Sequence, residues 1–115
     1  MILPARIKLS RATTVKFQTI KNKTGVTPNI LARIALVKAI ESGSDFRNSK
    51  MEDSDGQDLN RDVLFGEHAS SYDILLRQYI SENDVNEKAA DIVSALIEIG
   101  AHKMGHIRSI QELTA

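Results

Sequence analysis

Cysteine and tryptophan are absent from this chain of 115 residues, and aromatic residues make up only 4% of it. Without cysteine there can be no disulfide, thiolate metal site, iron–sulfur cluster, cysteine nucleophile or sulfur carrier. No stretch approaches the roughly 18 apolar residues that a membrane span needs, and the amino-terminal MILPARIKLS is too short and too basic for a secretory signal. A cytoplasmic location is therefore expected.

Acidic residues are missing from the first 40 positions, although the whole chain balances 15 basic against 15 acidic residues. Residues 41–115 hold all 15 acidic groups and seven basic ones, so the two parts carry +8 and −8. Such asymmetry indicates a polyanion-binding part joined to an acidic part; a basic face folded against an acidic one is the alternative. The eight early basic residues are Arg6, Lys8, Arg11, Lys16, Lys21, Lys23, Arg33 and Lys38.

The first predicted element is a short strand. Residues 6–9 alternate, with Arg6 and Lys8 on one side and Ile7 and Leu9 on the other, and this period of two predicts a half-buried strand. A single strand this short needs a partner. Because no second strand is apparent nearby, we expect it to pair with the same strand of another subunit.

Two helices follow the strand. Ser10 is placed as the N-cap of a helix over residues 11–23, and Gly25 supplies its stop. Thr27 and Pro28 then give the start signal of a helix over residues 28–41. That second helix is apolar around most of its circumference, which predicts burial. In so small a chain we expect another subunit to provide it.

The rest of the chain is predicted to be a polar loop and two more helices. Residues 42–62 are rich in Ser, Asp, Asn and Gly, which predicts a solvated loop. Capping-box spacing opens a helix at Ser70 and Asp73, and Asp84 and Glu87 open another in the same way. Gly100 weakens the far end of that last helix or permits close backbone packing.

The predicted fold is mainly α, in a single domain over residues 1–115. A ribbon-helix-helix-like DNA-binding part of one strand and two helices occupies residues 1–43. A polar loop over 44–62 and a helical carboxyl-terminal part over 63–115 follow. Two paired strands are the right width for the DNA major groove, and Arg6 and Lys8 would lie on the exposed side of such a ribbon.

The turn between the first two helices is a second candidate for DNA contact. A helix N-terminus attracts anions, and the first turn of the second helix, residues 28–30, carries no acid of its own. A DNA phosphate would fill that position, whereas a plain helix cap with solvated lysines is the alternative. The candidate DNA-binding residues are Arg6, Lys8, Lys16, Lys21, Lys23, Thr24, Gly25, Thr27 and Asn29.

The sequence offers little for catalysis. His102 and His106 are four residues apart, but HKMGH lacks the glutamate of the zinc-protease motif and no third ligand is identifiable. His68 beside Glu67 is interpreted as a helix-entry residue. We therefore predict no catalytic residue, no metal site and no cofactor, and a protein that is not an enzyme.

Two segments of the chain resemble the DndE family, the small subunits of the bacterial DNA phosphorothioation (DNA sulfur-modification) system. One is LPARIKLSRATTVKFQTIKNKTGVTPNILARIALVKAIESG over residues 3–43. The other is LFGEHASSYDILLRQYI over residues 64–80, where the matching positions are Gly66, Glu67, Tyr72, Leu75, Leu76 and Gln78. Lys21, Lys23 and Gly25 fall where the family has its basic turn.

The resemblance implies a non-catalytic subunit that binds double-stranded DNA through its backbone, including nicked duplex, and that forms a homotetramer. The implied partners are a sulfurtransferase-like subunit and an ATPase of the same complex, with no membrane association. Two other hypotheses remain open at this point. One is a ribbon-helix-helix repressor or antitoxin that reads bases through Arg6 and Lys8. The other is a protein-only adaptor whose acidic half docks a basic partner.

Overall fold

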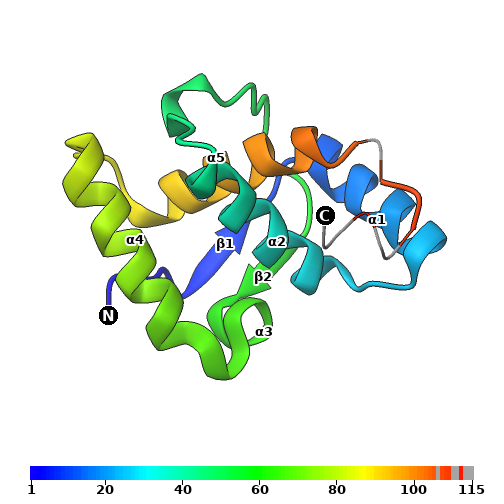
Figure 1. The fold of residues 1–115 in the computed structure, drawn as a ribbon, viewed down its shortest axis with the longest axis horizontal. Coiled ribbons are helices and arrows are strands. Elements are labelled where there is room, and N and C mark those ends of the chain that lie inside the picture. The colour runs from blue at the N-terminus through cyan, green and yellow to red at the C-terminus, as the bar shows by residue number, and fades with distance from the viewer. Residues whose placement is uncertain (106, 110–111, 113–115) are drawn as a thin grey trace.

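The computed structural model describes residues 1–105, 107–109 and 112 (Figure 1). Helices dominate, as predicted, and a two-stranded sheet lies among them. In chain order the elements are β1 (Arg6–Lys8), α1 (Arg11–Thr24), α2 (Pro28–Glu41), the 3-10 turn η1 (Phe46–Asn48), β2 (Asp58–Asn60), α3 (Arg61–Phe65), the 3-10 turn η2 (Gly66–His68), α4 (Ala69–Asn83) and α5 (Ala89–Lys103). Among these helices none is long and apolar enough to cross a membrane.

The partner of β1 is β2 of the same chain, in an antiparallel pair that places Ile7 opposite Leu59. The expectation of pairing with another subunit was therefore wrong. β2 was not predicted, because it has a single apolar residue, Leu59, between two exposed polar ones. The pairing extends beyond the strands, since the Leu9 N–H donates to the Gln57 carbonyl at 2.9 Å and the Gly56 N–H donates to the Leu9 carbonyl at 2.9 Å.

The apolar helix α2 lies across α5 at the centre of the molecule (Figure 1). α1 and α3 also pack against it, and its buried residues are Leu31, Ala32, Ala35, Leu36 and Ala39. Most of its apolar surface is thus covered within the chain, so the expectation that another subunit would bury it was wrong. Ile30, at the start of α2, is the exception and stays 41% exposed.

The start and stop signals of the first two helices are confirmed. The Ser10 hydroxyl accepts the Thr13 N–H at 3.0 Å, and Gly25 ends α1 with a φ of 79°, a conformation that costs glycine little. Thr27 and Pro28 begin α2. Asp84 was predicted wrongly as a start, because it ends α4 with a φ of 49° and α5 begins only at Ala89.

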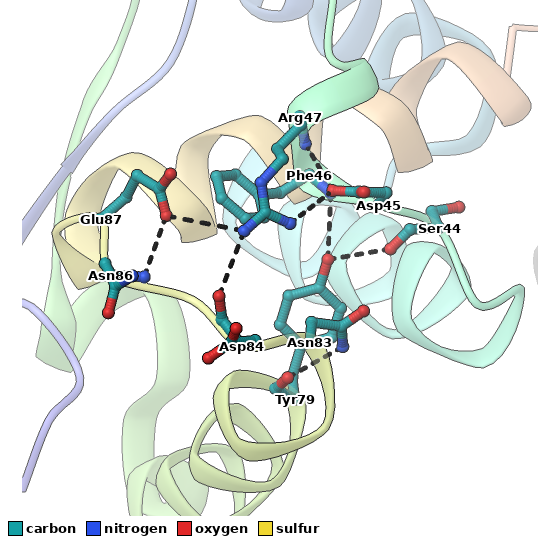
Figure 2. A network of polar contacts seen from close by, with 9 residues as sticks. All are labelled: Ser44, Asp45, Phe46, Arg47, Tyr79, Asn83, Asp84, Asn86 and Glu87. Carbon is teal, nitrogen blue, oxygen red and sulfur yellow. Dashed lines mark hydrogen bonds and ion pairs between the residues drawn. The ribbon is translucent and has the colours of Figure 1, made fainter.

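Most residues of the segment predicted as a solvated loop are exposed, but its first part, residues 44–47, is anchored to α4 and to the approach to α5 (Figure 2). The Tyr79 hydroxyl accepts the Phe46 N–H at 3.0 Å and donates to the Ser44 carbonyl at 2.9 Å. Arg47 lies over the Phe46 ring, 4.6 Å from its centroid, and donates to the Asp84 carbonyl at 3.3 Å. These contacts join residues more than 30 positions apart in the chain, so composition alone did not indicate them.

Candidate nucleic-acid interface

The turn between α1 and α2 presents two lysines on a rigidly held backbone. Lys21 and Lys23 are exposed in the last turn of α1. The Gly25 N–H donates to the Lys21 carbonyl at 2.7 Å. The hydroxyl of buried Thr24 donates to the Ile20 carbonyl at 2.8 Å and accepts the Val26 N–H at 3.2 Å. Thr24 and Gly25 therefore shape the turn, while the two lysines face solvent.

The start of α2 is capped through backbone rather than side chains. The Thr27 carbonyl accepts the N–H groups of Ile30 and Leu31 at 3.1 and 3.0 Å. The Thr27 hydroxyl donates to Asn29 Oδ1 at 2.5 Å, and Asn29 Nδ2 donates to the Val63 carbonyl at 3.2 Å. Asn29 thus ties the turn to α3. The Leu31 bond is the first regular hydrogen bond of the helix, whereas the Ile30 bond occupies an N–H group that would otherwise be free. With a proline at the first position as well, this helix start has few free donors for a phosphate.

The start of α1 contrasts with that of α2, because carboxylates from later in the chain cover it. The Ser10 hydroxyl donates to Glu98 Oε2 at 2.7 Å, and the Thr13 hydroxyl donates to the same oxygen. Asp53 accepts the Arg11 N–H at 2.9 Å. Hydrogen bonds from the N–H groups of Asp55 and Arg11 lower the pKa of Asp53. The positive end of α1 is therefore neutralised from within the chain.

The basic residues of the ribbon lie among carboxylates. Arg6 pairs with Asp58 at 3.3 Å. Arg6 and Lys8 also line a groove of about 540 Å³ that three acids share with them, Glu52, Asp53 and Asp91. These acids repel phosphate, so the ribbon is a less favourable DNA surface than the α1–α2 turn.

The candidate residues do not lie at one place, because Arg6 and Lys8 are on β1, Lys16 is within α1 and the others are at the α1–α2 turn. β1 leads directly into α1, whose 14 residues make it about 21 Å long, and the turn lies at its far end (Figure 1). Lys16 is half-buried midway along α1, in a groove whose other wall carries Arg108. Sequence reasoning missed Arg108, because nothing in its local sequence indicates that it lies near α1.

The structure adds nothing to the case for metal binding. Within the described residues, no group of three or more His, Asp or Glu side chains could hold a metal ion. His102 is exposed near the end of α5, and His106 lies outside the described residues. His68 lies on an exposed surface, where its Nε2 is 3.9 Å from Glu67 Oε1.

Fold and site together define a small, mainly helical protein with an internally paired strand and a basic turn between its first two helices. The family model for the DNA sulphur modification protein DndE matches residues 6–112. The chain therefore belongs to the DndE family, which confirms the resemblance seen in its sequence, and it is a protein of the DNA phosphorothioation system.

Solved structures agree with this assignment. DndE from Escherichia coli B7A, which is involved in DNA phosphorothioation modification, is 30% identical with a TM-score of 0.70, over 89% of this chain and 98% of that chain. A glycine-to-lysine mutant of DndE involved in DNA phosphorothioation is also 30% identical over the same shares, with a TM-score of 0.68. No curated protein matches the chain.

Proposed function

We propose that this protein is a non-catalytic DNA-binding subunit of the phosphorothioation complex and that it grips the sugar-phosphate backbone, including that of nicked duplex. One observation carries the proposal. Lys16, Lys21 and Lys23 lie on α1, which carries no acidic residue, and within the described chain they form no ion pair, whereas acids do reach Arg6 and Arg11. The chain's own acids thus leave the α1–α2 side positively charged.

Backbone binding of this kind has a clear physical signature. Each phosphate that a lysine neutralises releases counterions, so the affinity falls steeply as salt is added. Because phosphates carry no sequence information, the preference among duplexes of different sequence should be weak. The subunit would then hold DNA in register while other subunits carry out the chemistry.

The proposal includes an oligomer, with a homotetramer as its expected form, and a complex with the sulfurtransferase-like and ATPase subunits. Ile30 and Val63 remain 41% and 48% exposed, and Asn29 joins their two elements beside the basic turn. Apolar groups in such a position suit contact with another protein surface. Several copies would multiply the number of phosphate contacts without changing any single site.

The test is fluorescence anisotropy with a labelled short duplex of arbitrary sequence, in intact and nicked forms. We expect the affinity to fall at least tenfold between about 50 and 200 mM salt, with little difference between unrelated sequences. An affinity that does not change with salt would contradict backbone gripping. Capture of partner subunits after nuclease treatment, combined with no DNA affinity, would favour the adaptor hypothesis instead.

The repressor hypothesis makes a different prediction. It needs Arg6 and Lys8 to read base edges, so binding should be tight on one palindromic operator and weak elsewhere. The ion pair between Arg6 and Asp58 does not favour that role. Selection from random duplexes distinguishes the two hypotheses, because backbone gripping returns no consensus.

A further inference from the structure

A groove of about 280 Å³ runs along one side of α1, opposite the chain that follows α5. Its floor is apolar: the lining includes Ile20 and Ile107, which are 2% and 1% exposed, and Val15, which is 60% exposed. Thr19 also lines it, on the same helix. A valine this exposed, above buried isoleucines, gives the groove an apolar surface that water reaches.

The charged residues that line this groove are both basic. Lys16 stands on the α1 side and Arg108 on the other, and none of the lining residues is acidic. Glu112, the acid nearest to Arg108 in sequence, accepts the Arg108 backbone N–H at 2.9 Å and the Ser109 hydroxyl at 3.3 Å. Within the described residues, neither Lys16 nor the Arg108 side chain forms an ion pair.

The groove also leads toward the basic turn. Lys23 follows Thr19 by four residues on α1, a spacing that places both on one face of a helix. An anionic chain that enters between Lys16 and Arg108 can therefore continue to Lys23. The groove beside β1, with its three acids, offers no such path.

The combination of cationic walls and apolar floor identifies the form of DNA that fits. Duplex DNA presents phosphates outward, so it can use the charged walls but not an apolar floor. A single strand exposes its sugars and bases as well, and proteins hold it with a positive groove and with side chains, mostly aromatic, against the base faces. In this groove the exposed apolar side chain is Val15. We propose that the α1 groove holds an unpaired DNA strand, as found at an overhang or an opened nick, with Lys16 and Arg108 on its phosphates and Val15 against a sugar or base. This inference rests on the proposed function.

The experiment compares a blunt duplex with the same duplex carrying a single-stranded overhang, by anisotropy at fixed salt. Thr19→Glu places a carboxylate in the groove, and Gln18→Glu adds the same charge on the same exposed helix outside its lining. We expect Thr19→Glu to weaken overhang binding about tenfold more than Gln18→Glu does, because a charge close to the phosphates acts more strongly than a distant, screened one.

A second variant tests the apolar floor without changing charge. Val15→Ser should weaken the overhang complex and leave the blunt-duplex affinity unchanged, with circular dichroism as a check that α1 is intact. Equal effects of Thr19→Glu and Gln18→Glu on both DNAs would overturn the groove assignment while the proposed function stands. A shift in sedimentation with Val15→Ser would also overturn it, since the groove would then be a contact between copies. A wild-type protein that binds no DNA at all contradicts the proposed function itself.

Discussion

Gly100 of α5 lies directly against the backbone of Ala35 in α2. A Cβ atom added to Gly100 would be 1.9 Å from the Ala35 carbonyl oxygen and 2.7 Å from its Cα. The two central helices can approach this closely only because Gly100 has no side chain. The contact sets the position of α2, and therefore of the turn that precedes it, relative to the rest of the molecule.

Gly100→Ala should therefore destabilise the protein by about 3 kcal/mol, at the upper end of the range for overpacking a core. The obstacle is backbone, which cannot rotate away as a side chain can. Gly105→Ala is the matched control, because its added Cβ would lie 3.5 Å from the nearest atom, the His102 carbonyl oxygen. Urea denaturation measures both variants, and equal stability of the two would contradict this account of the helix contact.

Local signals predicted the first 41 residues well. The alternation of residues 6–9, the N-cap at Ser10, the stop at Gly25 and the start at Pro28 all depend on short-range chemistry that the sequence displays. The family resemblance was also visible in the sequence, since family motifs are local patterns.

The sequence-based predictions that failed concern contacts between segments distant in the chain. β2 pairs with a strand about 50 residues earlier in the chain, and a three-residue strand with one apolar position has almost no periodic signal. The burial of α2 by α5 could not be predicted either, because α2 is apolar around most of its circumference and so does not indicate which surface covers it. Arg108 joins Lys16 across a groove only through the tertiary fold.

Asp73 makes the stability of the fold depend on pH in the acidic range. Its carboxylate accepts the N–H groups of Ile2 and Leu3 at 2.6 and 2.9 Å and the Arg77 Nε–H at 2.8 Å. The Arg77 hydrogen bond is the main reason that the pKa of Asp73 falls to about 2.

Because the folded pKa is below the ordinary value of 3.8, the carboxylate stabilises the fold above pH 4 and this contribution is lost as the pH falls toward 2. Asp73→Asn should thus be less stable than the wild type at pH 7, and the difference should shrink steadily below pH 4. Urea titrations of both proteins across that range provide the measurement. A difference independent of pH would show that packing, not ionisation, is lost.

The hydroxyl of Tyr79 should contribute to the stability of the fold through its two hydrogen bonds. Tyr79→Phe leaves the Phe46 N–H and the Ser44 carbonyl without their partner (Figure 2). Leaving buried groups unsatisfied costs about 1–3 kcal/mol. Tyr72→Phe is the control: its ring contacts Phe65 at 4.9 Å between centroids, and within the described residues its hydroxyl makes no hydrogen bond. Thermal denaturation should separate the two variants, and identical melting temperatures would contradict the anchoring role of the Tyr79 hydroxyl.

Lys21 and Lys23 should dominate the salt dependence of DNA binding. Removing two phosphate contacts lowers the steepness of the plot of log affinity against log salt by roughly 1.8. The double variant Lys21→Ala, Lys23→Ala should therefore bind every duplex more weakly and lose affinity less steeply with salt. The control is the double variant Lys50→Ala, Lys88→Ala, which removes the same charge from exposed positions elsewhere. It should leave the slope unchanged. If the two double variants had the same slope, the protein would be responding to overall charge, and the basic turn would have no special part in holding DNA.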